Sequence, residues 1–248
     1  MKIAIIGKGG VGKSTITAML AKSLSKDKEV LVIDGDESNL TLNKFLGIER
    51  GKEFINYIGG REGFKKLKRS EKLFKNKISL NDIKEYLTKK DNIYFLTIGK
   101  IHDFGEGCAC PIGALLKELL NNLDFDGYTI IDTEAGLEHF GRGVEESCDL
   151  IILIVDPTLE SLNFAEKVKD ICQRLGKNYY FIINKADDET LKILLDRLDK
   201  DKILGVIKEN REIVRKCLLG EELEPVEEIE KIAHFITSNS KTIPSPNL

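Results

Sequence analysis

A glycine-rich segment near the amino terminus restricts this chain to a small set of folds. Residues 7–14 read Gly-Lys-Gly-Gly-Val-Gly-Lys-Ser and fit G-x-x-x-x-G-K-[ST], between an apolar run and a helical pattern. The glycines let backbone N–H groups face phosphate oxygens, and the helix amino terminus adds a favourable dipole. In such a loop Lys13 reaches the β- and γ-phosphates of a nucleotide, and the Ser14 hydroxyl binds Mg²⁺. The predicted nucleotide-binding residues here are Gly7, Lys8, Gly9, Gly10, Val11, Gly12, Lys13, Ser14 and Thr15.

Short apolar runs alternate with helical patterns along the chain. The predicted strands are Lys2–Ile6, Glu29–Ile33, Ile93–Ile98, Tyr128–Asp132, Leu150–Val155, Tyr179–Asn184 and Ile203–Ile207. The predicted helices are Lys13–Ser25, Ala114–Leu123, Leu159–Leu175, Thr190–Asp199 and Val226–Thr237. Several strands are apolar throughout, as in sheets covered by helices on both faces. We therefore predict an α/β fold with a mostly parallel central sheet.

Length and composition favour one domain. The 248 residues suffice for one well-buried α/β domain and are few for two, so we predict a single domain over residues 1–248. Lysine and arginine are concentrated in residues 61–90, which we interpret as a helical surface insertion between strands. That insertion is either a solvated basic face or a docking surface for an acidic partner. Residues 238–248 are expected to form a frayed tail.

Charge and hydropathy exclude several classes of function. The net charge of −3 gives no overall attraction to nucleic acid, so we do not expect nucleic acid as a partner. No apolar run approaches the roughly 20 residues that span a bilayer, and we expect no membrane association. The first residues do not resemble a signal peptide, which predicts a cytoplasmic location. Five cysteines, an odd number, argue against a disulfide framework.

Acidic residues end two of the predicted strands. The second strand is followed by Asp34-Gly35-Asp36, and Asp132 ends the strand that begins at Tyr128. Carboxylates at the carboxyl ends of parallel strands lie beside the nucleotide crevice. We interpret Asp132 as the Walker B aspartate, which holds Mg²⁺ through water. The alternative for Asp34 or Asp36 is a capping role at the turn that follows.

Lys8 narrows the class of phosphate-binding loop. Together with Lys13 it gives K-G-G-x-G-K-[ST], which resembles the deviant Walker A motif of the MinD, ParA and nitrogenase iron protein class. The resemblance implies a homodimer whose two chains face each other across two ATP molecules. It also implies that Lys8 contacts phosphates bound to the partner subunit, where it stabilises charge as an arginine finger does. Lys8 and Lys13 are therefore candidate catalytic residues.

The same resemblance assigns roles to residues outside the loop. The segment that begins at Asp34 corresponds to switch I, in which Asp36 orients the attacking water as a catalytic residue. Asp34 then lies nearer the Mg²⁺ shell, which Ser14 and Asp132 complete. Asn184, followed by Lys185, reads the adenine edge in this class. The implied cofactors are ATP and Mg²⁺. ATP is expected in preference to GTP, because Asp187 is interpreted as one position too late for the aspartate of an N-K-x-D motif.

A pair of cysteines lies between a predicted strand and a predicted helix, in Gly107-Cys108-Ala109-Cys110-Pro111. Two thiolates cannot complete a tetrahedral site, but two chains related by a two-fold axis supply four sulfurs. Four sulfurs suit Zn²⁺ in a tetrahedron or Ni²⁺ in a square plane. The alternative is that both cysteines are core residues, which the flanking glycines and proline disfavour. Cys148, Cys172 and Cys217 are expected in the core.

The resemblance becomes narrower when these features are combined. Lys8, the G-C-x-C-P segment and the sequence from Asp132 to Gly143, D-T-E-A-G-L-E-H-F-G-R-G, together resemble the CooC-type carbon monoxide dehydrogenase maturation ATPases. That family is associated with nickel insertion into a Ni-Fe-S cluster. The resemblance implies nickel delivery driven by ATP hydrolysis, with Cys108 and Cys110 as the metal ligands at the dimer interface. It also implies a client metalloenzyme such as carbon monoxide dehydrogenase.

Two other functions remain open at this point. One is a positioning switch of the MinD or ParA kind, although the acidic residues 221–230 disfavour a membrane-binding helix at the carboxyl end. The other is an electron-transfer reductase that resembles the nitrogenase iron protein. That family needs a cysteine just after switch II, and residues 133–137 contain none. A cluster on four sulfurs from Cys108 and Cys110 is still conceivable.

Overall fold

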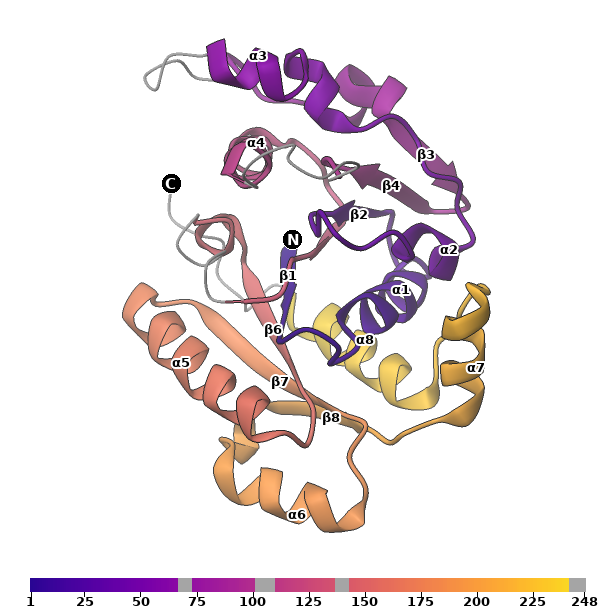
Figure 1. Cartoon of the computed structure of the whole chain (residues 1–248), viewed down its shortest axis with the longest axis vertical. Helices are drawn as coiled ribbons and strands as arrows, with labels where there is room; N and C mark the ends of the chain where they lie inside the picture. Colours follow the sequence, from indigo (N-terminus) through magenta and orange to yellow (C-terminus); the bar gives the residue numbers. More distant parts are fainter. Residues whose placement is uncertain (67–72, 101–109, 137–142, 241–248) are drawn as a thin grey trace.

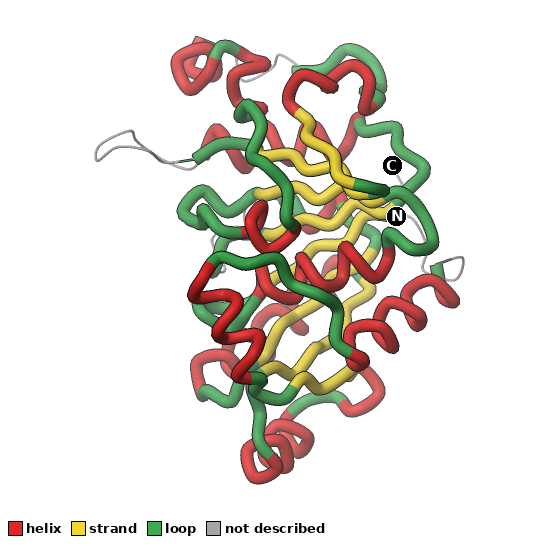
Figure 2. Tube along the Cα trace, turned by 90° about the vertical axis from the view of Figure 1, so that its right-hand side faces the viewer, coloured by secondary structure: helices red, strands yellow, loops and turns green. Residues whose placement is uncertain are grey.

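A computed structural model describes residues 1–66, 73–100, 110–136 and 143–240 of the chain. A twisted eight-stranded sheet lies at its centre, with helices on both faces (Figures 1 and 2). The strands are β1 (Lys2–Ile6), β2 (Val30–Asp34), β3 (Leu87–Lys90), β4 (Ile93–Thr97), β5 (Tyr128–Asp132), β6 (Leu150–Val155), β7 (Asn178–Asn184) and β8 (Ile203–Ile207). The predicted α/β fold with a mostly parallel sheet is confirmed.

The strand order explains where a site can form. The order is β3-β4-β2-β5-β1-β6-β7-β8, and every neighbouring pair is parallel except β3 with β4. The chain leaves β1 toward one side of the sheet for β2 and later reaches β6 on its other side. Ligands of such sheets bind beyond the carboxyl ends of the strands where the order reverses. The glycine-rich loop follows β1 and occupies this position.

Helices cover the sheet in two layers (Figure 1). The α-helices are α1 (Lys13–Leu24), α2 (Leu42–Leu46), α3 (Gly60–Lys66), α4 (Cys110–Asn122), α5 (Leu159–Leu175), α6 (Asp188–Arg197), α7 (Arg211–Leu219) and α8 (Glu227–Asn239). Short 3-10 helices are η1 (Phe54–Ile58), η2 (Leu80–Tyr86), η4 (Glu145–Ser147) and η5 (Lys200–Lys202). Among the described residues, no helix combines the length and apolar character needed to cross a membrane.

The core consists of two apolar layers, one on each face of the sheet. Because successive strand residues point to opposite faces, Ile3 and Ile5 of β1 belong to one layer, and Ala4 and Ile6 belong to the other. The first layer includes residues of α1 and α8, and the second includes residues of α4 and α5. Burial on both faces accounts for the continuous apolar runs that predicted these strands.

Two predictions at the periphery need correction. Residues 61–90 were expected to be helical, but Leu87–Lys90 form β3, which pairs antiparallel with β4. The tight turn between them places Asp91 at a φ of 51°, a conformation that aspartate tolerates better than most residues. At the other end, α8 continues to Asn239 and so enters the expected tail. Residues 241–248 of that tail lie outside the described residues.

Candidate nucleotide site

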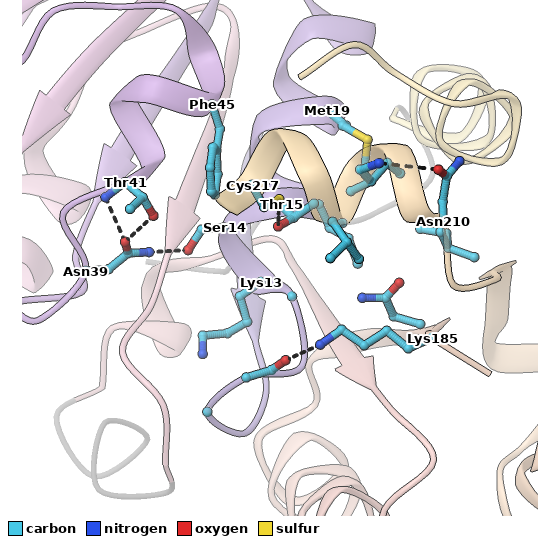
Figure 3. A pocket seen from close by; sticks show the side chains of 18 of the residues that line it. Lys13, Ser14, Thr15, Met19, Asn39, Thr41, Phe45, Lys185, Asn210 and Cys217 are labelled. Atoms are coloured by element: carbon cyan, nitrogen blue, oxygen red, sulfur yellow. Dashed lines mark hydrogen bonds between the residues drawn. The ribbon is translucent and has the colours of Figure 1, made fainter. Parts of the chain in front are cut away.

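The loop between β1 and α1 borders a cavity of about 630 Å³ (Figure 3). Lys13, Ser14 and Thr15 line it, as do Gly9, Gly10 and Gly12. Gly12 has a φ of 100°, and a Cβ at this position would lie 2.5 Å from Asn184 Nδ2, so only glycine fits here. The cavity therefore meets the amino terminus of the twelve-residue helix α1, where free N–H groups favour phosphate.

Asp132 does not line the cavity itself, but it contacts Ser14, which does. Ser14 Oγ donates a hydrogen bond to Asp132 Oδ2 at 2.6 Å, and Thr17 Oγ1 approaches Asp132 Oδ1 at 3.4 Å. Asp132 is completely buried, and this burial raises its pKa to about 7, although the hydrogen bond from Ser14 acts in the opposite direction. A hydroxyl and a buried carboxylate in direct contact are oxygen ligands of the kind that Mg²⁺ prefers.

Asp34 lies next to Asp132 on the neighbouring strand, because Asp34 of β2 and Asp132 of β5 are register partners. Its carboxylate also forms an ion pair with Lys100, with 2.7 Å between Lys100 Nζ and Asp34 Oδ2. Burial raises the pKa of Asp34 to about 6, while the Lys100 ammonium lowers it. Sequence reasoning did not identify Lys100. Its only signal is its place three residues after β4, the strand that pairs with β2.

Asp36 borders the cavity and is nearly buried. Its Oδ1 accepts hydrogen bonds from the Ser38 backbone N–H at 2.9 Å and from the Ser38 hydroxyl at 2.7 Å. The Asn39 backbone N–H also donates to this oxygen, at 3.2 Å. In this structure Asp36 thus closes the turn that follows β2. Of the two aspartates, Asp36 has the turn-capping contacts that the sequence offered as an alternative.

Asn184 and Lys185 support the loop from the end of β7. Asn184 Nδ2 donates to the Val11 backbone oxygen at 2.7 Å, and Lys185 Nζ donates to the Gly10 backbone oxygen at 2.6 Å. Both residues also line the cavity. The predicted nucleotide-binding pair therefore lies at the site, and its donors hold the loop backbone.

Asp187 completes an N-K-x-D sequence with Asn184 and Lys185, a match that the sequence interpretation overlooked. In guanine-specific proteins the aspartate of this motif binds the base. Here Asp187 Oδ1 accepts from the Thr190 backbone N–H at 2.8 Å and from the Thr190 hydroxyl at 2.6 Å. Asp187 is the N-cap residue of α6. Its capping role is consistent with the expectation of ATP rather than GTP.

Helix α7 forms a wall of the cavity that the sequence did not reveal. Ile213, Val214, Cys217 and Leu218 line the cavity from this helix. Figure 3 shows Cys217 beside Thr15. Cys217 was expected in the core, but it is only partly buried, and its Sγ lies 3.5 Å from Thr15 Oγ1. The recurrence of apolar residues at i, i+1, i+4 and i+5 was the available signal. Cys148 and Cys172 are buried, as expected.

Lys8 lies at the edge of the loop rather than inside the site. Its Nζ is 3.5 Å from Glu160 Oε2 at the start of α5, and both side chains are solvent-accessible. Cys108 lies outside the described residues. Cys110 is the first residue of α4, but its side chain is not described. Within the described part of the chain, no group of three or more His, Cys, Asp or Glu residues could hold a metal ion.

The fold and this site define a P-loop nucleotide-binding domain. More specifically, residues 2–223 match the family described as CobQ/CobB/MinD/ParA nucleotide binding domain, and the chain belongs to this family. The chain is an ATPase of this class. Its fold is that of MinD from Pyrococcus horikoshii in complex with Mg-ADP, with a TM-score of 0.73 over 98% of both chains at 22% identity.

Two sequence relatives lie closer than this structural match. The "uncharacterized ATP-binding protein MJ0084" of Methanocaldococcus jannaschii is 53% identical over 248 residues, which cover 96% of this chain and all of the relative. The carbon monoxide dehydrogenase accessory protein CooC of Rhodospirillum rubrum is 36% identical over 229 residues, covering 84% of this chain and 83% of CooC. The expected likeness to CooC-type proteins is therefore supported.

Proposed function

We propose that this chain is a cytoplasmic, nucleotide-dependent metallochaperone. Two copies close around ATP, bind nickel at cysteine thiolates and release it for the maturation of a Ni-Fe-S enzyme. The similarity to CooC along most of the chain and the Cys108/Cys110 pair support this function. Carbon monoxide dehydrogenase is the client that this similarity suggests.

The observation that carries the proposal is the position of α4, the helix that begins at Cys110. Gly113 and Leu116 of α4 line a small cleft together with Gly35 and Glu37 after β2 and with Thr133 and Glu134 after β5. A Cβ on Gly35 would lie only 3.1 Å from Leu116 Cδ2. The loop after β2 therefore packs closely against the helix that carries a cysteine, and the loop after β5 borders the same cleft. A shift of either loop would act directly on α4.

The residues of the site fit an ATP hydrolysis reaction. Ser14, Asp34 and Asp132 form an oxygen-rich set that suits Mg²⁺, which would neutralise phosphate charge. Lys13 binds the β- and γ-phosphates, and Asp36 orients the water whose oxygen bonds to the γ-phosphorus as the bond to ADP breaks. Lys8 of each subunit stabilises charge on the phosphates of the other subunit.

Nickel is the cargo of this cycle. Two thiolates from each subunit, Cys108 and Cys110, give four sulfurs when the dimer closes. Such a set accepts Ni²⁺ or Zn²⁺. Hydrolysis then loosens the dimer and lowers the affinity for the metal, which the client takes up.

The test combines sedimentation with metal analysis of the purified protein, with and without a non-hydrolysable ATP analogue. We expect about one Ni²⁺ or Zn²⁺ per nucleotide-bound dimer, because the four-sulfur site forms once per two-fold axis. The variant Cys108→Ser/Cys110→Ser should lose the metal and still dimerise. Cys172→Ser, which changes a buried cysteine of α5, should keep both properties. A wild-type dimer that binds no metal would exclude the metallochaperone function.

A positioning switch of the MinD or ParA kind is the second candidate. Solved structures with the same fold include MinD and plasmid partition proteins. The first turn of α8 carries Glu227, Glu228 and Glu230, which oppose binding to an anionic membrane. Retention on DNA or on anionic vesicles that requires ATP would favour this candidate, and an absence of such retention would leave the metallochaperone.

A further inference from the structure

Lys100 is a lysine whose side chain is completely buried. It follows β4, and its ammonium reaches across to the acidic loop after β2. Lys100 Nζ lies 2.7 Å from Asp34 Oδ2, and neither side chain has any exposed surface. The same ammonium donates a hydrogen bond to the backbone oxygen of Asp36. One side chain therefore contacts Asp34 at the end of β2 and the backbone of Asp36 in the loop that follows.

The backbone of Lys100 is held in place as well. Its N–H donates to Glu53 Oε2 at 3.1 Å, and its carbonyl oxygen accepts from Arg61 Nη2 at 3.4 Å. Arg61 Nη2 is also 3.7 Å from Glu37 Oε2, one residue after Asp36. Lys100 is thus fixed at its backbone while its ammonium holds the loop. The start of the basic segment takes part in this network.

Stability alone is a poor reason for this arrangement. Removing an ammonium and a carboxylate from water costs several kcal/mol for each ion, and apolar residues of similar size would often be at least as stable. The ammonium has a more specific effect on Asp36. The carboxylate of Asp36 contacts its own loop, so the direction of that side chain depends on where its peptide group lies.

We propose that Lys100 is a positioning residue for hydrolysis, which fixes the Asp36 peptide and thereby the direction of the Asp36 carboxylate. The proposal rests on the proposed role of Asp36 as the group that orients water. Lys100 itself touches neither nucleotide nor water in this scheme. Its loss should slow turnover and leave ATP binding largely intact, because Lys13 and the loop after β1 are unchanged.

The main experiment compares steady-state ATP hydrolysis by the wild type, Lys100→Met and Lys22→Met. Lys22 is a suitable control, because it is a mostly buried lysine of α1 whose Nζ pairs with Glu224 at 3.0 Å. For Lys100→Met we expect kcat to fall roughly tenfold to a hundredfold. KM for ATP should stay within about threefold of the wild type. For Lys22→Met kcat should stay within about twofold of the wild type. Wild-type kcat in a folded Lys100→Met protein would overturn the proposal.

Loss of Lys100 leaves the Asp34 carboxylate buried without its partner, which can prevent folding. The double variant Asp34→Asn/Lys100→Met has neither buried charge and is compared with Asp34→Asn, whose buried ammonium has lost the carboxylate, so circular dichroism first establishes that both variants fold. The lysine still reaches the Asp36 carbonyl in the single variant. We therefore expect the double variant to be about tenfold slower in kcat than Asp34→Asn. Equal kcat values would overturn the proposal.

The variant Asp36→Ala distinguishes the proposed role of Asp36 from the proposed role of Lys100. If Lys100 acts through Asp36, adding Lys100→Met to Asp36→Ala should change kcat by less than about twofold. A full additional loss would mean that Lys100 acts elsewhere, and the proposal would be wrong. If Asp36→Ala hydrolyses ATP at the wild-type rate, the role of Asp36 itself is wrong. Slow Asp36→Ala with normal Lys100→Met would reject only the role of Lys100.

Discussion

The side-chain amide of Asn39 donates a hydrogen bond to Ser14 Oγ, the same hydroxyl that donates to Asp132 Oδ2. Asn39 Oδ1 in turn accepts from the Thr41 backbone N–H at 2.9 Å and from the Thr41 hydroxyl at 2.7 Å. The acidic loop after β2 is thereby attached to the first turn of α1. A Mg²⁺ ion at Ser14 would compete with the Asn39 amide, which already occupies one of the two lone pairs of the hydroxyl oxygen.

Replacing Asn39 should therefore make Mg²⁺ binding easier. A hydrogen bond of this kind contributes about 0.5–1.5 kcal/mol, so Asn39→Ala should lower the Mg²⁺ concentration for half-maximal ATP binding by roughly two- to tenfold. Titration of Mg²⁺ against a fluorescent ATP analogue measures this. Thr41→Val, which leaves the amide in place, should behave like the wild type. An increased Mg²⁺ requirement in Asn39→Ala would show that Asn39 helps rather than competes.

The two buried aspartates predict an unusual dependence of stability on pH in Mg²⁺-free buffer. The pKa values of Asp34 and Asp132 are about 6 and about 7 in the folded chain, against 3.8 for an ordinary aspartate. At pH values between the ordinary pKa and these raised pKa values, the folded state binds more protons than the unfolded state. The contribution of this pair to the free energy of unfolding therefore decreases as pH rises from about 4 to about 7.

This effect can be measured by thermal unfolding between pH 5 and pH 8. Asp132→Asn should gain melting temperature relative to the wild type as pH rises, by roughly 2–4 °C for each kcal/mol. Asp126→Asn, which changes an exposed aspartate on the surface, is the control and should follow the wild type at every pH. A difference between Asp132→Asn and the wild type that is the same at all pH values would contradict the raised pKa.

Lys8 should be restrained by Glu160 before two subunits meet. The pair is solvent-accessible, so it contributes at most about 1 kcal/mol. Glu160→Gln should lower the protein concentration needed for ATP-dependent dimerisation by up to about fivefold at low salt. Lys8→Ala should lower kcat at least about tenfold. Analytical ultracentrifugation and phosphate release measure the two effects.

Glu166 provides the matched control for that experiment. It lies on the same helix α5 and pairs with Arg197 at 2.7 Å, away from the nucleotide site. Glu166→Gln should dimerise like the wild type. If Glu166→Gln and Glu160→Gln have equal effects, the cause is the lost charge on α5 and not the release of Lys8.

Binding of both nucleotides to variants can show whether Asn184 supports the loop backbone or recognises the base. Because Asn184 Nδ2 holds the Val11 carbonyl, Asn184→Ala should weaken ATP and GTP equally, by roughly tenfold. Asp187→Ala removes the cap of α6 and should cost about 1 kcal/mol of stability without changing the preference between the two nucleotides. Competition binding with both nucleotides tests this. A selective loss of ATP in Asn184→Ala would instead support direct contact with adenine.

Sequence reasoning located the elements whose signals are local. The predicted bounds of β1, β5, β6 and β8 agree with the observed ones, because each strand is an apolar run. The predicted and observed bounds of helix α5 also agree. Strand β3 was missed because Leu87-Thr88-Lys89-Lys90 has no apolar run, and only pairing with β4 makes it a strand.

Residues of the site also differ in whether they belong to a local motif or are brought in by distant parts of the chain. The loop after β1 has a motif, so its residues were found from the sequence. Lys100 has no motif, and its partner Asp34 is far away in the chain, so only the pairing of β2 with β4 brings them together. Helix α7 was missed although its apolar residues recur with helical spacing, and none of its residues is buried. It lines the cavity because the chain after β8 places α7 beside the loop after β1, and a local sequence pattern does not predict this position.

Strand β3 also has a consequence for how copies of this chain can associate. It forms one outer edge of the sheet, is only four residues long and ends in Lys89 and Lys90. Lys90 Nζ contacts Glu222 at 2.7 Å, and Lys89 Nζ contacts Glu29 at 3.0 Å. A foreign strand that aligned with this edge would have to dehydrate both ammonium groups. Short, charged edges of this kind protect a sheet against aggregation by strand addition, so we expect β3 to resist pairing with a strand from another chain.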